Sequence, residues 1–130
     1  MPDCPFCTPA PALYEGHALH SPLAHVRQDK YPVSPGHLLI IPNRHVSDWF
    51  ALTAEEQAAV MQLVNQAKQW LEQYHKPVGY NIGMNCGDAA GQTVMHMHCH
   101  LIPRYRGDCK DPRGGIRWVL PEQAPYWENH

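Results

Sequence analysis

The chain has 130 residues, of which 44% are apolar, which is the size of one ordinary domain with a single hydrophobic core. Ten Lys and Arg residues against twelve Asp and Glu residues give a net charge of −2, which does not favour binding to a nucleic-acid backbone. No apolar run reaches the ~18 residues that a membrane span requires, and the N-terminus lacks the basic start and apolar run of a signal peptide. Five cysteines, an odd number, suit a reducing compartment better than a disulfide framework. We therefore expect a cytoplasmic protein that binds neither nucleic acid nor a membrane.

Prolines crowd both ends of the chain, which predicts extended or looped ends around a central region of regular structure. Within that region, one amphipathic helix is predicted over residues 53–75, with Thr53 as its cap and Glu56 reaching back to close a capping box. A short helical turn capped by Ser47 is predicted just before it. Apolar and β-branched runs predict strands at residues 24–29, 37–41, 78–84 and 94–102.

Three histidines alternate with apolar residues in the last of these predicted strands. Successive side chains of a strand point to opposite faces, so His96, His98 and His100 would share one face. Three adjacent cations would repel one another, and three buried neutral rings would each need a partner, so packing alone explains this pattern poorly. One alternative is that all three bind one metal ion. Their span of ~13 Å along a straight strand argues against it.

Residues 96–102 match, position for position, the signature of the histidine-triad family, in which three histidines alternate with apolar residues. The resemblance extends to residues 91–94 and to the block at 29–45, and it covers about residues 4–105. The predicted helix and strands, like the resemblance, indicate an α+β fold with a mostly antiparallel sheet of about five strands, one long helix and a short one. The whole chain, 1–130, is then a single histidine-triad domain. Its expected appendages are an extended metal-binding arm at 1–15 and a C-terminal loop and tail at 104–130.

The resemblance also implies a nucleotidyl hydrolase or transferase that acts at the α-phosphate of a purine nucleotide conjugate. A neutral imidazole is a competent nucleophile, and His98 matches the family's nucleophile, its other ring nitrogen donating to a main-chain carbonyl. His100 would hold or stabilise a phosphate oxygen, and His96 completes the catalytic triad. A hydroxyl at Thr93 would contact the leaving-group oxygen, and the side chain or backbone at Gln92 would line the phosphate pocket. Thr93 is alternatively an ordinary strand residue.

Three further positions match the family's substrate pocket. Asp29 would accept hydrogen bonds from the ribose hydroxyls, unless it is a plain turn residue. Asn85 would contact phosphates, and His37 would support the pocket from behind. The substrate that the resemblance favours is a dinucleoside polyphosphate. One alternative is an adenosine phosphoramidase, which would cleave an adenosine phosphoramidate. The other is a nucleotide-binding regulator with little turnover.

Cys4 and Cys7 form a C-x-x-C pair, which supplies half of a tetrahedral metal site. In metal-containing branches of the family the other half comes from the positions of His45 and His96. The resemblance therefore implies a structural zinc ion and no organic cofactor. The alternative is an exposed pair of free thiols.

Five of the ten cationic residues lie between 104 and 117. They form either a solvated loop or a lid that meets the distal phosphates of a substrate. Near the end of the chain, Trp118, Tyr126 and Trp127 either stack on a base or anchor the tail. The resemblance also suggests a homodimer in which the long helix and an edge strand pair across a two-fold axis.

Overall fold

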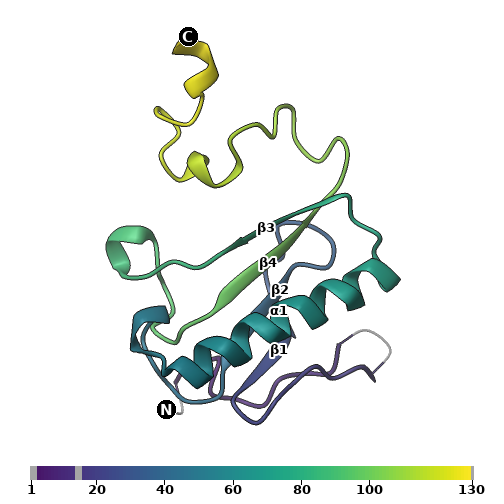
Figure 1. Ribbon diagram of the computed structural model, residues 1–130, viewed down its shortest axis with the longest axis vertical. Coiled ribbons are helices and arrows are strands. Elements are labelled where there is room, and N and C mark those ends of the chain that lie inside the picture. The colour runs from purple at the N-terminus through teal and green to yellow at the C-terminus, as the bar shows by residue number, and fades with distance from the viewer. Residues whose placement is uncertain (1–2, 14–15, 130) are drawn as a thin grey trace.

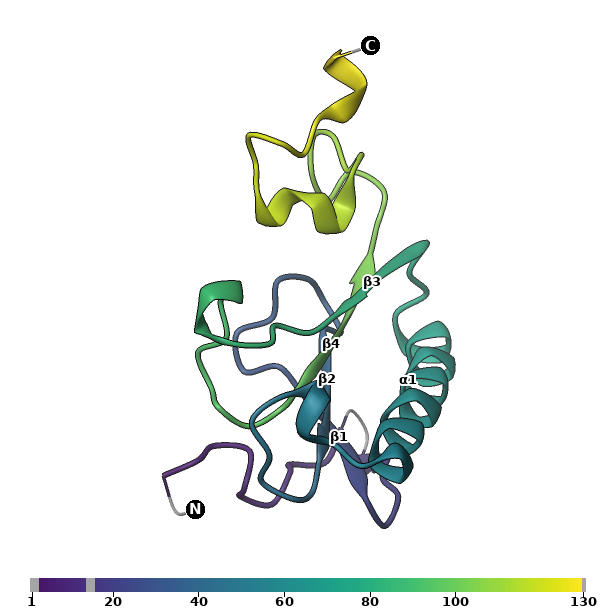
Figure 2. The same cartoon turned by 60° about the vertical axis from the view of Figure 1, so that its left-hand side comes forward.

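The computed structural model describes residues 3–13 and 16–129 of the chain, so part of the predicted N-terminal arm lies outside the described residues. A single antiparallel sheet has the order β1-β2-β4-β3, and the long helix α1 covers one of its faces (Figures 1 and 2). The predicted α+β class is confirmed, but the described residues form four strands and not about five. The strands are β1 (Ala24–Gln28), β2 (Leu38–Pro42), β3 (Gly79–Gly83) and β4 (Cys99–Arg104).

Helix α1 (Ala54–Tyr74) begins as the sequence predicts. The hydroxyl of Thr53 accepts from the backbone N–H of Glu56 at 3.1 Å, and a Glu56 carboxylate oxygen accepts from the backbone N–H of Thr53 at 2.9 Å. These two bonds satisfy N–H groups that have no partner within the helix. Among the described residues, no helix is both long and apolar enough to cross a membrane.

The core lies between α1 and the sheet. Strand β4 alternates strictly, so that the buried Cys99, Leu101 and Pro103 face the helix. The other face of β4 carries His100, Ile102 and Arg104, which are half-buried. The residues that pack between the helix and the sheet include Val60, Leu63, Val64, Ala67, Leu71, Val26, Leu38 and Ile40. Because α1 occupies one face, the opposite face of the sheet is the one that can carry chemistry.

The predicted strand at 94–102 is wrong in its first half, because β4 begins only at Cys99. The backbone N–H of Met97 donates to the carbonyl of Val46 at 2.8 Å, which ties this segment to the loop after β2. The side chain of His96 is fully buried, whereas His98 and His100 are half-buried. The break in the strand therefore separates His96 from the face that the other two histidines share.

The short turn before α1 is a 3-10 helix at Trp49–Ala51, and its cap is Asp48 rather than the predicted Ser47. The Asp48 carboxylate accepts from the backbone N–H groups of Phe50 and Ala51 at 2.9 and 3.3 Å. Ser and Asp are comparable caps, so the sequence alone does not distinguish two such neighbours.

Gly36 shapes the turn that precedes β2. Its φ of 89° lies in the left-handed region, and a Cβ there would come within 2.9 Å of a methyl group of Leu71. Both observations require glycine at this position. The turn therefore packs closely on α1, and it delivers His37 to the start of β2.

Candidate functional site: a cysteine–histidine cluster beside two paired histidines

Cys4, Cys7, His45 and His96 converge, and their four ligand atoms all lie within 4.8 Å of one another. The Sγ atom of Cys4 is 3.4 Å from Nδ1 of His96. The Sγ atom of Cys7 is 3.2 Å from Nδ1 of His45 and 3.5 Å from Nδ1 of His96. The structure thus brings together all four residues of the predicted metal set.

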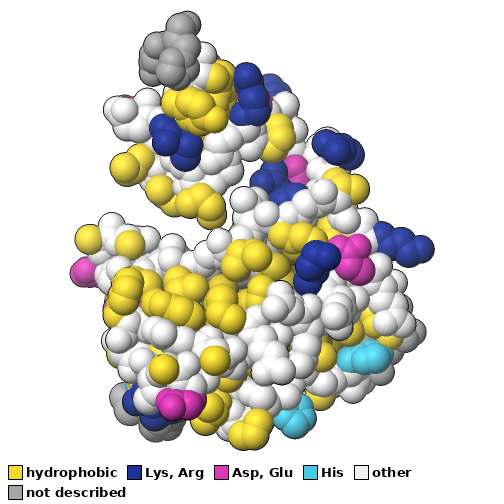
Figure 3. Space-filling view, viewed as in Figure 1, with side chains coloured by type: hydrophobic (Ala, Val, Ile, Leu, Met, Phe, Trp, Pro, Cys, Tyr) yellow, Lys and Arg dark blue, Asp and Glu magenta, His cyan; other side chains and the backbone are white. Residues whose placement is uncertain are grey.

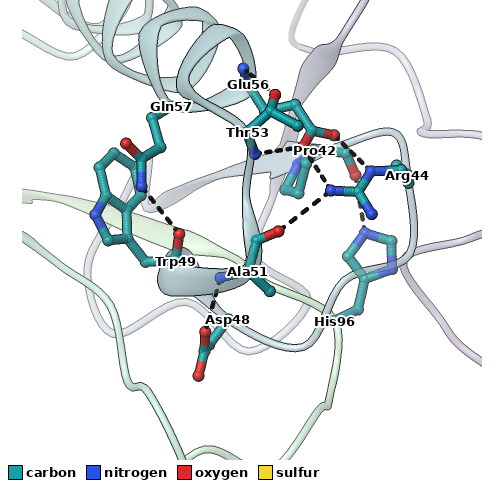
Figure 4. A network of polar contacts seen from close by, with 9 residues as sticks. All are labelled: Pro42, Arg44, Asp48, Trp49, Ala51, Thr53, Glu56, Gln57 and His96. Atoms are coloured by element: carbon teal, nitrogen blue, oxygen red, sulfur yellow. Dashed lines mark hydrogen bonds and ion pairs between the residues drawn. The ribbon is translucent and has the colours of Figure 1, made fainter.

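The donor chemistry of this cluster fits a zinc ion. Zn–S bonds of about 2.3 Å and Zn–N bonds of about 2.0–2.1 Å at tetrahedral angles place S and N ligands about 3.6 Å apart, close to the observed separations. Nε2 of His96 lies 2.8 Å from the carbonyl oxygen of Pro42, to which it donates (Figure 4). With its proton on Nε2, His96 has a free lone pair on Nδ1, and that nitrogen faces the cysteines. Burial lowers the pKa of His96, which also favours the neutral ligand form.

Arg27 of β1 holds the segment that carries the two cysteines. Its side chain is buried, and it donates to the carbonyl oxygens of Pro5 at 3.0 Å and Thr8 at 2.8 Å. A guanidinium has donors in a fixed fork, so it fixes the position of both carbonyls at once. This arm is therefore held to the sheet independently of any metal ion.

His98 lies directly beside this cluster. Its Nδ1 is 2.9 Å from the carbonyl oxygen of His96, so Nδ1 carries the proton and donates it there. Nε2 consequently has the free lone pair of a nucleophile. The ring of Phe6, between the two cysteines, packs edge-on against the ring of His98 with 5.0 Å between centroids.

His100 lies next to His98, with their ring centroids 5.3 Å apart. Nδ1 of His100 is 2.9 Å from Nε2 of the buried His37 and 3.9 Å from a carboxylate oxygen of Asp29. Burial, with the neighbouring His98 and His37, lowers the pKa of His100 to about 4. His100 is therefore neutral at neutral pH. Through these contacts, four of the predicted site residues form one continuous group: Asp29, His37, His98 and His100.

The remaining predicted residues lie on the long connection between β3 and β4. Asn85 is half-buried and Thr93 is exposed. Gln92 is buried and is held by hydrogen bonds within the protein. Its side-chain oxygen accepts from Gly87 N–H at 2.8 Å, and its side-chain nitrogen donates to the carbonyls of Ser47 and Val94. Its backbone N–H donates to the carbonyl of Gly87, so Gln92 braces the loop.

The C-terminal segment folds into two short 3-10 helices, Gly115–Val119 and Tyr126–Asn129 (Figure 1). The first of them contacts β3, and the segment forms a lobe that projects beyond the sheet (Figure 3). Arg113 lies over the ring of Trp127, 4.5 Å from its centroid, and Arg117 lies over the ring of Tyr126 at 4.8 Å. The Trp118 indole N–H donates to the carbonyl of Arg113 at 2.7 Å. The aromatic residues of the tail thus serve as internal anchors of this segment.

The comparison with protein families decides what kind of domain carries this site. The HIT domain family model matches residues 13–107. The chain belongs to the histidine-triad family. A solved HIT family protein from Bacillus anthracis superposes with a TM-score of 0.72 at 29% identity and covers 98% of this chain and 96% of that one.

Curated proteins of known sequence give the same family. The protein named hit of Bacillus subtilis is 32% identical over 113 residues, which is 82% of this chain and 74% of that protein. A Mycobacterium tuberculosis protein named AP-4-A phosphorylase is 39% identical over 79 residues, 60% of this chain and 40% of that protein. The asymmetrical bis(5'-nucleosyl)-tetraphosphatase of Schizosaccharomyces pombe is 40% identical over 77 residues, 59% of this chain and 42% of that protein. The matched histidine-triad segment is thus less than half of each of these two relatives.

Two residues of this site escaped sequence reasoning. Phe6 was visible only as a spacer in the C-x-x-C pair, and Arg27 only as a polar residue in a strand. A cation at an otherwise buried strand position was the one available signal for Arg27, because such a residue needs partners.

Proposed function

We propose that this histidine-triad protein is a nucleotidyl hydrolase that cleaves purine nucleotide conjugates, such as dinucleoside polyphosphates, at the α-phosphate. The proposed intermediate is a nucleotide bound covalently to His98. One observation carries the proposal: the hydrogen bond of 2.9 Å from Nδ1 of His98 to the carbonyl of His96, which leaves Nε2 unprotonated. A neutral imidazole held in this tautomer is ready to attack phosphorus.

The reaction proceeds in two displacements. Nε2 of His98 bonds to the α-phosphorus while the bond from phosphorus to the bridging oxygen breaks, and the leaving group departs with that oxygen. A water oxygen then bonds to the phosphorus, the P–N bond breaks, the electron pair returns to His98 and a water proton passes to solvent. His100, whose ring neighbours that of His98, stabilises the charge that develops on the phosphate oxygens.

Substrate binding falls to residues around this pair. The Asp29 carboxylate uses one oxygen to accept from the backbone N–H of Tyr31 at 2.8 Å, and its half-buried position leaves acceptor capacity for ribose hydroxyls. Asn85 contacts the phosphates, and the Thr93 hydroxyl donates to the leaving-group oxygen. The names of the mycobacterial and yeast relatives support a dinucleoside polyphosphate as the substrate class.

The proposal is tested by initial rates on diadenosine tetraphosphate, diadenosine triphosphate and an adenosine phosphoramidate, each with and without inorganic phosphate as a second acceptor. Wild type is compared with H98A, which we expect to lose turnover by about 10⁴-fold or more. Trapping with a radiolabelled substrate should label wild type and not the variant. Preference for the phosphoramidate would assign a P–N hydrolase and contradict the polyphosphate substrate. Nucleotide binding without turnover of any substrate would contradict the enzyme and favour a regulator.

A structural zinc ion at Cys4, Cys7, His45 and His96 forms part of this proposal. When bound, such an ion fixes the side chains that ligate it. His96 would then have two roles. Its ring would ligate the metal, and its backbone carbonyl fixes the tautomer of His98. The cluster therefore orients the nucleophile without touching the substrate. The site needs no organic cofactor for this chemistry.

The proposal includes a homodimer. Strand β3 lies at an edge of the sheet. Ile82 on this strand is 49% exposed, and Val78 just before it is 61% exposed. Open sheet edges with apolar residues favour pairing with another copy. We expect light scattering at micromolar concentration to give twice the mass of one chain, and I82K to lower it. A monomeric wild type would contradict the dimer.

A further inference from the structure

Asp29 just after β1, His37 just before β2 and His100 on β4 form a compact group. Nε2 of His37 is 2.9 Å from Nδ1 of His100 and 3.4 Å from a carboxylate oxygen of Asp29. His37 is 3% exposed and comes from the turn that Gly36 shapes. The site chemistry proposed above uses His100 and Asp29 directly, but it gives His37 no task beyond support.

The backbone amide of Val33 determines where the proton of His37 lies. This N–H donates to Nδ1 of His37 at 3.1 Å. A ring nitrogen that accepts a hydrogen bond carries no proton, so the proton of a neutral His37 is on Nε2. A cationic His37 is excluded by the same contact, because a proton on Nδ1 would face the amide proton. Burial, which lowers the pKa of His37 despite the nearby Asp29, agrees with the neutral form.

The Nε2–H of His37 then determines the tautomer of His100. Its nearest acceptor is Nδ1 of His100, at 2.9 Å. Because Nδ1 of His100 accepts this bond, the proton of neutral His100 is on its Nε2. His98 has the opposite arrangement, with its proton on Nδ1 and directed at the His96 carbonyl. The two neighbouring rings thus present different atoms: His98 a lone pair and His100 an N–H donor.

A metal ion is the other occupant that this group suggests, since its three ligand atoms lie within 4.8 Å of one another. The Val33 amide argues against it. A metal on Nε2 of His37 requires the ring proton to sit on Nδ1, and Nδ1 already accepts the amide N–H. The contacts are those of a hydrogen-bond chain from Val33 through His37 to His100.

We infer that His37 is a positioning residue that, held by the Val33 amide, keeps His100 in the Nε2–H tautomer so that it donates to the phosphate oxygen during nucleotidyl transfer. This role rests on the proposed function for its use in the reaction. The tautomer itself is a property of the protein without substrate, so it can be measured separately.

The test is two-bond ¹H–¹⁵N correlation NMR of the imidazole nitrogens in ¹⁵N-histidine-labelled protein, with His37 and His100 assigned by the variants H37Q and H100Q. In wild type we expect a protonated Nε2 and an unprotonated Nδ1 on both residues. In H37F the donor is gone, and we expect an Nδ1–H form of His100 to appear. A wild-type His100 protonated on Nδ1, or a tautomer unchanged in H37F, would overturn the inference.

Kinetics provide the second measurement. H37F should lower kcat by at least about tenfold with a much smaller change in KM, because the lost donor acts in the transition state. H37Q should recover much of that loss, since a Gln amide can both accept from Val33 and donate to His100. The control H20F makes the same change at an exposed histidine and should leave kcat unchanged.

The two proposals fail in different ways. A His100 tautomer that depends on His37, in a protein without turnover of any nucleotide conjugate, would contradict the proposed function and leave the coupling intact. An active enzyme in which H37F and H37Q lose equal activity, with the His100 tautomer unchanged, would contradict the coupling alone. The measurement of the wild-type tautomer does not depend on whether H37F folds. A wild-type His100 protonated on Nδ1 would therefore overturn the inference even if H37F misfolded.

Discussion

The ring of Phe6 lies edge-on against the ring of His98, with 5.0 Å between the ring centroids. Phe6 sits between the two cysteines of the proposed metal site, and its ring also approaches that of His96 at 6.1 Å. The loop that would bind zinc therefore also supplies one wall for the proposed nucleophile. Phe6 thus belongs to both the proposed metal site and the proposed catalytic site, although it is not a metal ligand.

Removing this wall should impair the reaction without removing the metal. We expect F6A to lower kcat/KM by about tenfold, because the truncated side chain no longer restrains the His98 ring. Zinc content, measured by elemental analysis, should stay that of wild type. The control F50A makes the same change at a phenylalanine that is 79% exposed. Equal activities of F6A and F50A would show that the contact has no part in catalysis.

Arg27 should stabilise the N-terminal arm. R27M removes its hydrogen bonds to the carbonyls of Pro5 and Thr8, and bonds with a charged donor contribute about 1.5–3 kcal/mol each. We expect the free energy of unfolding to fall by about 3 kcal/mol or more and a chelator to remove zinc faster. Denaturant unfolding and a chelator time course measure the two effects. R113M, at an exposed arginine, should change chelation little; matching rates in the two variants would contradict this role.

Local patterns predicted the elements that local physics controls. The periodicity and capping box of residues 53–75 predicted α1 within a residue or two, because cap and apolar spacing are both encoded in consecutive residues. The strand segments followed from β-branched runs in the same way. The break before Cys99 was not predictable, because it depends on the bond from Met97 to Val46, on a distant loop.

The features of the site can be separated in the same way, into those encoded in consecutive residues and those that depend on distant residues. Spacing and family resemblance predicted the metal set and the three histidines. The hydrogen bond between His37 and His100 joins residues 63 positions apart, and the bond from Arg27 to Pro5 joins residues 22 apart. Tautomers follow from such bonds and from backbone carbonyls, which carry no residue-specific signal. Gln92 shows that a polar residue within a motif can also serve the fold, since its side chain braces its own loop.

The zinc proposal predicts about one zinc ion per chain in untagged protein. The double variant C4S/C7S should lose that zinc and melt lower by about 5 °C or more, because metal binding contributes to the stability of the folded state. C109S, at an exposed cysteine outside the cluster, is the matched control and should keep its zinc. Less than about 0.2 zinc per chain in wild type, with no gain on reconstitution, would contradict the site.

The last prediction concerns Glu56, which closes the capping box and pairs with Arg44 (Figure 4). Arg44 donates to both Glu56 carboxylate oxygens, at 2.7 and 3.0 Å, and Thr53 donates a backbone N–H at 2.9 Å. These hydrogen bonds lower the pKa of Glu56 from 4.5 to about 2. A folded-state pKa below the unfolded value means that Glu56 contributes stability above about pH 4.5, and that this contribution is lost as the pH falls toward 2.

E56Q should therefore destabilise the protein at pH 7 by about 1–2 kcal/mol, since the neutral amide loses the charge-assisted bonds and its NH2 group cannot accept from Arg44. Urea unfolding of both proteins across the range from pH 7 down to the acid limit measures the difference. The gap should narrow as the pH falls, because protonated Glu56 in wild type comes to resemble the amide. E55Q, an exposed neighbour in the same first turn, should differ from wild type by a few tenths of a kcal/mol. A gap between wild type and E56Q that is independent of pH would show that shape rather than charge accounts for the contribution of Glu56.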